Sequence, residues 1–308
     1  MADLHDRRRA RWRLVLATVA FAAWAPPSLA GLPFAGLMLA ARPRTATQWG
    51  TALVVGVPSV VLLLIGPGDP VSALARAYTV LVCAAFALLT LVAPARFLPQ
   101  ALRASVIALG AALLLARIVL GRQAPGLLQW EATRQASATL RALVDLRPEV
   151  YAAFGPVVRL LSETVPAVLV LQALGGLGLA WQWHQHLAPR PLGAPLAPFR
   201  EFRIADAWVW AVVASVAVLI TPFFAGLKTA ALNLLVVLGA LYLLRGAAIV
   251  VAFAGVAGIS PAALAVGLVL SAVLAVPLLF VLPGLATLGM SDTWLEFRRR
   301  LAGRPNAS

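Results

Sequence analysis

A single arginine, Arg245, lies in the middle of the apolar run "LYLLRGAAIVVA", residues 241–252. A guanidinium is always charged and carries five N–H donors, so it binds carboxylates, phosphates or carbonyl oxygens. In hydrocarbon it costs at least about 2.5 kcal/mol unless it faces other helices or a wet cavity. Two interpretations follow. Arg245 either snorkels or bonds to carbonyls at a helix contact, or it holds an anionic or hydrogen-bonding ligand in a polar pocket.

Two other isolated polar side chains are candidate ligand contacts. Asn233 lies twelve residues before Arg245 on the same predicted helix, and Gln172 lies near the middle of another apolar segment. Each could instead hydrogen-bond between helices. Asp206 and Glu201, which precede the apolar segment 207–224, are the predicted partners of Arg245 because they lie at the same end of the helices.

Residues suited to catalysis are scarce. His184 and His186, in "WQWHQH", have no Asp or Glu within ten residues, and a metal site needs three or four ligands. No H-E-x-x-H, G-x-S-x-G or phosphate-binding loop occurs. We therefore expect no enzyme activity, no metal and no cofactor. Glu163 is the only acidic residue expected to enter a span, so a self-powered ion-coupled carrier is also disfavoured.

The elements that carry these residues follow from the composition. Of the 308 residues, 62% are hydrophobic and 12% charged, whereas soluble domains carry about 25% charged residues. Lys and Arg outnumber Asp and Glu by 25 to 11, but they are spread over helix ends, which indicates membrane topology rather than nucleic-acid binding. We predict an all-α integral membrane protein, a bundle of about eight transmembrane helices plus interfacial amphipathic helices, forming a single polytopic domain over residues 1–308.

Hydropathy divides the chain into eight apolar segments. They are residues 14–40, 51–66, 71–93, 104–121, 158–183, 207–224, 229–254 and 259–288. Pro26 and Pro27 interrupt the first, which could cross once as a broken helix, form a hairpin, or be a signal peptide cleaved near Ser28–Ala30. Small residues recur at four-residue spacing, which predicts close helix packing: Gly31/Ala35, Gly36/Ala40, Ala108/Ala112/Ala116 and Gly176/Ala180.

Three polar stretches complete this organisation: a basic N-terminus (1–13), residues 122–157 and a basic C-terminal tail (289–308). The middle stretch reads as an amphipathic helix lying in the membrane interface. In the tail, Asp292 could cap a short interfacial helix. We expect the tail to bind anionic lipid through four residues: Trp294, Arg298, Arg299 and Arg300. Basic residues favour a bacterial-type inner membrane with both termini cytoplasmic.

The last hundred residues resemble a known family. They contain "FREFRIADAWVW" (199–210), "NLLVVLGALYLLRGAAIVVAFAG" (233–255) and "LGMSDTWLEFRRRL" (288–301). In this order they resemble the YybS-like family of predicted membrane proteins, a domain of unknown function distantly similar to the S components of energy-coupling factor transporters. The resemblance implies a helical bundle that binds a small molecule from the outer side and takes its energy from a partner. S components generally have six helices, and no vitamin-binding motif is matched here.

Two functional hypotheses follow. The first is an S-component-like subunit that binds or transports a small solute, with the lipid bilayer, a ligand and a membrane energy-coupling partner around it. The second is a non-transporting membrane scaffold or assembly protein with a filled interior. No nucleic-acid partner is expected.

Overall fold

The computed structural model describes residues 2–92, 96–146, 154–188, 190–260, 263–264, 266–267, 270 and 276–297. These residues form helices, turns and loops without a strand, which confirms the predicted all-helical class for the described part of the chain. The helices pack as two compact units, unit 1 (Met1–Leu196) and unit 2 (Ala197–Ser308). One membrane domain over 1–308 stays a prediction.

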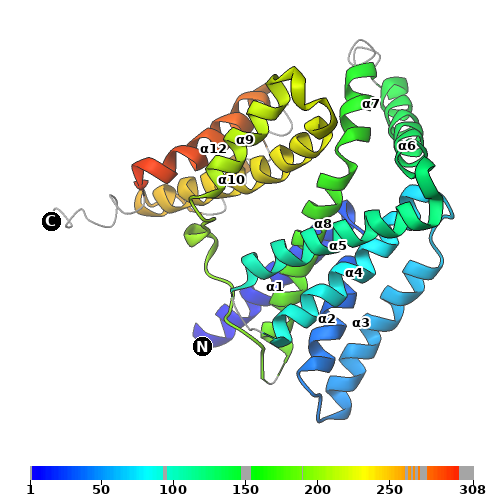
Figure 1. The fold of residues 1–308 in the computed structure, drawn as a ribbon. Coiled ribbons are helices and arrows are strands. Elements are labelled where there is room, and N and C mark those ends of the chain that lie inside the picture. The colour runs from blue at the N-terminus through cyan, green and yellow to red at the C-terminus, as the bar shows by residue number, and fades with distance from the viewer. Residues whose placement is uncertain are drawn as a thin grey trace. The chain divides into compact units, whose positions relative to one another are not determined.

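Unit 1 contains eight α-helices and one short 3-10 helix among its described residues (Figure 1). They are α1 (Ala2–Trp24), α2 (Ser28–Ala40), α3 (Ala46–Leu64), α4 (Pro70–Val92), α5 (Phe97–Leu120), η1 (Gly121–Gln123), α6 (Ala124–Leu146), α7 (Phe154–Glu163) and α8 (Val165–Leu187). The segment 14–40 is divided at Pro26–Pro27 into α1 and α2, as the two prolines predict. Proline at the start of α2 is tolerated because the first N–H groups of a helix have no intrahelical acceptor.

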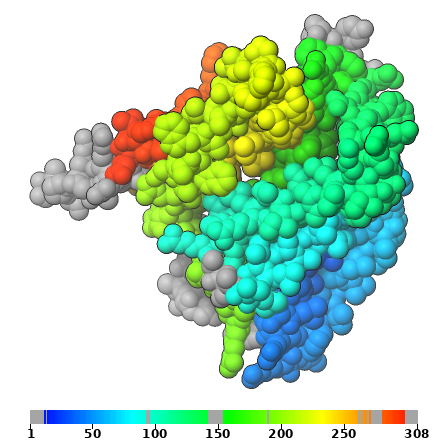
Figure 2. All heavy atoms as spheres, viewed as in Figure 1, coloured from blue at the N-terminus to red at the C-terminus, as the bar shows by residue number. Residues whose placement is uncertain are grey.

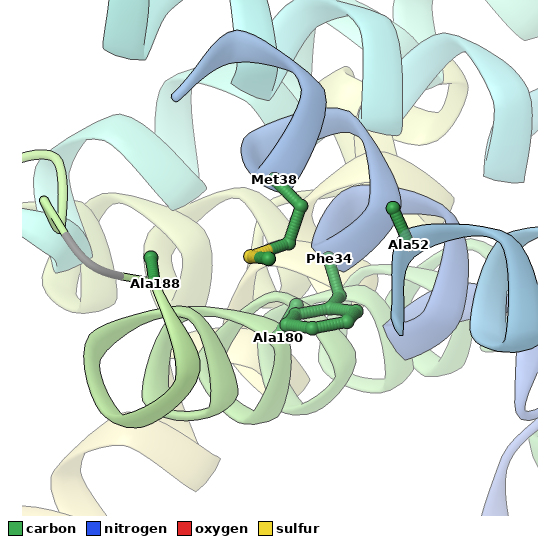
Figure 3. Packing of buried hydrophobic residues seen from close by; sticks show 5 residues of the cluster. All are labelled: Phe34, Met38, Ala52, Ala180 and Ala188. Atoms are coloured by element: carbon green, nitrogen blue, oxygen red, sulfur yellow. The ribbon is translucent and has the colours of Figure 1, made fainter. Parts of the chain in front are cut away.

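The short helix α2 lies at the centre of unit 1, in contact with α3, α4 and α8. Its Phe34 and Met38 pack against Ala52 of α3 and Ala180 of α8, and all four side chains are buried (Figure 3). A Cβ added at Gly176 of α8 would lie 2.6 Å from the carbonyl oxygen of Leu29. The four-residue spacing of small residues is therefore confirmed here as close packing within the bundle.

Apolar and polar side chains are distributed in unit 1 as expected for a protein in lipid. Val54 of α3 and Ile118 of α5 are 73% and 70% exposed, whereas the hydroxyl-bearing Tyr78 and Ser105 are fully buried. Figure 2 shows one face of the molecule on which atoms of α3 to α6, blue to green, form much of the surface. Such large exposed apolar side chains need a partner or a membrane to cover them.

Within the described residues, five helical segments are long and apolar enough to cross a membrane: Ala46–Leu64, Pro70–Val92, Phe97–Arg141, Val165–Leu187 and Pro222–Val256. The apolar helices α2 and α9 have 13 residues each. At 1.5 Å per residue they measure about 20 Å, less than the roughly 30 Å hydrocarbon core. The predicted count of about eight crossings is therefore not confirmed, and about a third of segment 259–288, including residues 271–275, lies outside the described residues.

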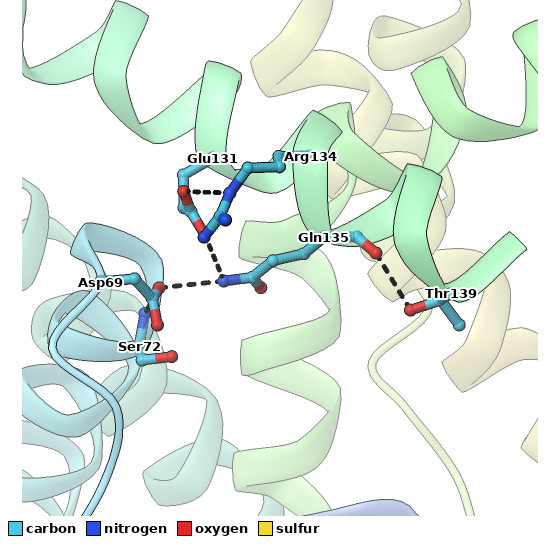
Figure 4. A network of polar contacts seen from close by, with 6 residues as sticks. All are labelled: Asp69, Ser72, Glu131, Arg134, Gln135 and Thr139. Atoms are coloured by element: carbon cyan, nitrogen blue, oxygen red, sulfur yellow. Dashed lines mark hydrogen bonds and ion pairs between the residues drawn. The ribbon is translucent and has the colours of Figure 1, made fainter. Parts of the chain in front are cut away.

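The predicted interfacial stretch 122–157 forms the end of η1, α6 and the start of α7, and residues 147–153 lie outside the described part. Leu140 of α6 is buried and Arg141 is exposed, in agreement with an amphipathic helix. A polar network joins α6 to the start of α4 (Figure 4). Gln135 Nε2 donates to Asp69 Oδ1 and to Glu131 Oε1, each at 2.9 Å. Arg134 in turn donates two hydrogen bonds to the buried Glu131 carboxylate.

We predict that the Asp69 contact makes stability depend on pH. Burial raises the pKa of the Asp69 carboxyl, but hydrogen bonds from Ser72 and Gln135 outweigh it, so this pKa lies below its ordinary value. A carboxyl with a lowered folded-state pKa stabilises above its unfolded pKa, about 3.9, and loses that contribution as the pH falls through the folded value. Between about pH 5 and pH 3, thermal unfolding should therefore show a larger fall in Tm for the native chain than for Asp69→Asn. Equal falls would contradict the prediction.

Unit 2 contains η3 (Phe199–Glu201), α9 (Trp208–Ile220), η4 (Pro222–Leu227), α10 (Lys228–Val256) and α12 (Val276–Leu295) among its described residues. Helices α9 and α10 pack together across the short η4 connection, and α12 packs on α10 (Figure 1). Residues 289–295, predicted to begin the tail, are instead the last two turns of α12. Within this stretch, Gly289 packs directly against the backbone of α10.

A buried charged centre in unit 2

Arg245 lies on α10 and is completely buried. Its guanidinium contacts two carboxylates of the same unit. Nε donates to Asp292 Oδ2 at 3.1 Å, and Nη2 lies 3.0 Å from the same oxygen. Nη1 donates to Asp206 Oδ1 at 2.9 Å and to the hydroxyl oxygen of Thr293 at 3.3 Å. Every guanidinium nitrogen is thus within 3.1 Å of a carboxylate oxygen.

Two glycines allow α12 to carry Asp292 to this position. A Cβ added at Gly246 would overlap the carbonyl oxygen of Leu285, and one added at Gly289 would overlap the carbonyl oxygen of Tyr242. The backbones of α10 and α12 therefore touch where these glycines meet. Gly246 follows Arg245 directly and Gly289 precedes Asp292 by about one turn, so the close approach sets the ion pair.

Asp292 is held at both carboxylate oxygens. Oδ2 accepts the hydrogen bond from Arg245 Nε, and Oδ1 accepts a hydrogen bond from the backbone N–H of Phe297 at 3.0 Å. Its side chain is only 1% exposed. The predicted capping role is thus met only in part, because Asp292 does accept an N–H of the following segment but lies inside α12 and serves mainly as the partner of Arg245.

Asp206 approaches Arg245 from the turn that precedes α9. Its side chain is 57% exposed. The segment before it lies against α10 through η3, and Ile204 is buried. One cation and two carboxylates give the centre a formal charge of −1, with the exposed carboxylate on one side of the guanidinium and the buried one on the other.

The structure brings Arg245 and Asp206 together and gives the other predicted site residues different partners. Asn233 Nδ2 donates to the Thr229 carbonyl at 2.8 Å, one turn earlier on α10. Glu201 pairs with its neighbour Arg200 at 3.8 Å. Gln172 belongs to unit 1, where its Nε2 donates to the Trp24 carbonyl at 3.0 Å and joins α8 to the end of α1.

Trp294, one of the predicted lipid-binding residues of the tail, is 65% exposed. Residues 298–300, which hold the three predicted lipid-binding arginines, lie outside the described part.

Asp292 and Thr293 are the functional candidates that sequence reasoning missed. Glu163, the one acidic residue expected to enter a span, pairs with Arg159 of its own helix at 2.8 Å. The signal that could have found Asp292 is the "LGMSD" sequence, in which a glycine that permits close helix contact stands one turn before an acidic residue.

Of the two histidines of α8, in unit 1, His184 has a packing role, whereas His186 is exposed and hydrogen-bonds to the Gln182 carbonyl of its own helix. His184 is buried, and its Nε2 accepts the Leu192 N–H at 3.0 Å. Trp181 Nε1 donates to the Ala194 carbonyl at 3.1 Å, and Gln185 Nε2 to the Leu192 carbonyl at 3.0 Å. The motif "WQWHQH" therefore holds the loop that follows α8 in place through hydrogen bonds to residues 192–194. In the part of the chain that the structure describes, His, Cys, Asp and Glu form no group of three or more that could hold a metal.

A family profile described as "Predicted membrane protein (DUF2232)" matches residues 30–293. The chain belongs to this family. The matched range contains Arg245, Asp206 and Asp292 together with all five candidate spans. Membership of DUF2232 and the apolar helices identify a multi-pass helical membrane protein that resides in a lipid bilayer. No curated protein and no solved structure shows a detectable match to the chain.

Proposed function

We propose that this DUF2232 protein is a non-enzymatic membrane subunit that binds a small solute for transport, with the charged centre of unit 2 as its binding site. The observation that supports this proposal most strongly is the burial of Arg245, which lies on a helix able to span a membrane and contacts both Asp206 and Asp292. Buried ion pairs can often be replaced by apolar residues without loss of stability. A buried arginine on a helix long and apolar enough to span a membrane therefore favours a functional role.

The resemblance of residues 199–301 to the YybS-like family, and its distant similarity to S components, supports the same proposal. From this resemblance and the distribution of basic residues, we propose that the protein works with an energy-coupling partner in an inner membrane of bacterial type, with both termini in the cytoplasm. Trp294 and Arg298–Arg300 would then anchor the tail in anionic lipid. Gln172 and Asn233 are left out of the proposed site, because their amides bind backbone carbonyls close to them in their own units.

One observation favours a scaffold instead. The guanidinium of Arg245 is paired with two protein carboxylates, and the backbones of α10 and α12 touch at the neighbouring Gly246. A scaffold would use the centre only to fix the register of α10 and α12. The two functions differ in whether a solute stabilises the protein.

Thermal unfolding of the protein in lipid nanodiscs, with a panel of vitamins and anionic metabolites, tests the proposal. We expect at least one compound to raise the Tm of the native protein, since a ligand at about 100 times its Kd adds about 2.7 kcal/mol. Arg245→Lys, which keeps the charge but cannot contact both carboxylates in the same way, should lose this response. Arg159→Lys, on the exposed face of α7, is the matched control and should keep it. No response to any compound would favour the scaffold.

A further inference from the structure

The two carboxylates bind the same guanidinium in unlike ways. Asp292 is 1% exposed, lies on a helix packed against α10 and uses both oxygens. Asp206 is 57% exposed, lies in a turn outside any helix and reaches only Nη1 through Oδ1. Asp292 is therefore built into the packing of unit 2, whereas Asp206 can leave Arg245 by a local movement of the turn before α9.

The charge of the centre is compatible with the replacement of Asp206 by a free carboxylate. With Asp206 in place, the guanidinium contacts one buried and one exposed carboxylate. A free monocarboxylate that takes the place of Asp206 leaves the charge around Arg245 unchanged, and the released Asp206 is returned to solvent. A dianion such as phosphate would add a second negative charge near the buried Asp292, which low dielectric makes costly.

We propose that Asp206 is an internal substitute for the ligand, and that a small monocarboxylate displaces it to bind Arg245 Nη1 beside the Thr293 hydroxyl. This inference rests on the proposed function and names its substrate class. Asp206 keeps the guanidinium paired when no solute is bound, which avoids an isolated buried charge. The natural solute must compete with a carboxylate tethered nearby, whose effective concentration is high. It therefore needs contacts beyond its carboxylate, whereas a small carboxylate suffices once Asp206 is removed.

Chemical rescue tests this inference. Asp206→Ala should lower the Tm and make unfolding sensitive to sodium acetate and propionate, which fill the vacated position and restore most of the lost Tm in a saturable way. Sodium chloride at the same ionic strength should not do so. The native protein and Glu201→Ala, a neighbouring exposed carboxylate paired with Arg200, should respond to acetate no more than to chloride. Asp292→Ala should not be rescued, because that position is closed to solvent.

An Asp206→Ala protein that responds to acetate no more than the native chain, or equally to chloride, overturns the inference. If Asp206→Ala does not fold, Asp206→Ser removes the charge and still leaves room for a carboxylate beside Arg245, and the same comparison decides. If acetate rescues Asp206→Ala but no compound raises the Tm of the native protein, Asp206 does occupy a carboxylate position, and the proposed solute transport is rejected. If a compound raises the Tm of the native protein but acetate does not rescue Asp206→Ala, the protein does bind a solute, and the position of Asp206 is rejected as the site of the solute's carboxylate.

Discussion

Substituting Arg245 by leucine is expected to lower the free energy of unfolding by about 3–5 kcal/mol, the range found when one member of a buried ion pair is removed. The change leaves the Asp292 carboxylate, 1% exposed, without its cation inside the contact between α10 and α12. Asp206 is 57% exposed and can turn to solvent, so most of the loss comes from Asp292. Unfolding in mixed micelles of a mild and a denaturing detergent measures the loss.

A double substitution separates charge from packing in this result. Arg245→Leu combined with Asp292→Leu removes both buried charges and should recover much of the stability lost by either change alone. Arg159→Leu removes an arginine that is 80% exposed and paired with Glu163, and it should change stability little. If the double variant shows the sum of the two single losses, Arg245 and Asp292 are not energetically coupled and the centre loses its physical basis.

The sequence located one half of this centre for a physical reason. A lone arginine in an apolar run must be sheltered, and Asp206 became a candidate because the predicted topology places it at the same end of the helices as Arg245. Asp292 is 47 positions from Arg245, and its contact depends on where α12 crosses α10. Hydropathy carries no information on that crossing, and the nearby arginines made the segment resemble a surface tail.

Helix positions were predicted better than the number of crossings. Pro26 and Pro27 correctly divided the first segment, because proline interrupts the helical hydrogen bonds at a fixed place. An apolar run, however, does not distinguish a lipid-facing helix from one buried in protein. The 13-residue α2 is apolar because it packs at the centre of unit 1. Hydropathy also does not predict that Glu131, on the predicted interfacial helix, is buried. Its carboxylate can be buried because Arg134 and Gln135 donate hydrogen bonds to it.

The second large effect is expected at Gly246. Replacing it by alanine places a methyl group on the carbonyl oxygen of Leu285, which belongs to the backbone of α12 and cannot turn away as a flexible side chain could. Overpacking costs about 1–3 kcal/mol, and contact with backbone places this change at or above the upper end of that range. Because α12 also carries Asp292, pushing α12 outward lengthens the ion pair to Arg245, and the two losses should be coupled.

Gly239 on the same helix provides the matched control, since a Cβ added there meets nothing within 4 Å. Gly239→Ala gains the helix propensity of alanine, worth up to about 1 kcal/mol, and should be neutral or stabilising. Gly246→Ala gains the same propensity, so a lower stability than that of Gly239→Ala measures the clash alone. Equal unfolding free energies for the two variants would mean that α10 and α12 do not touch at Gly246, and the close approach that positions Asp292 against Arg245 would then be wrong.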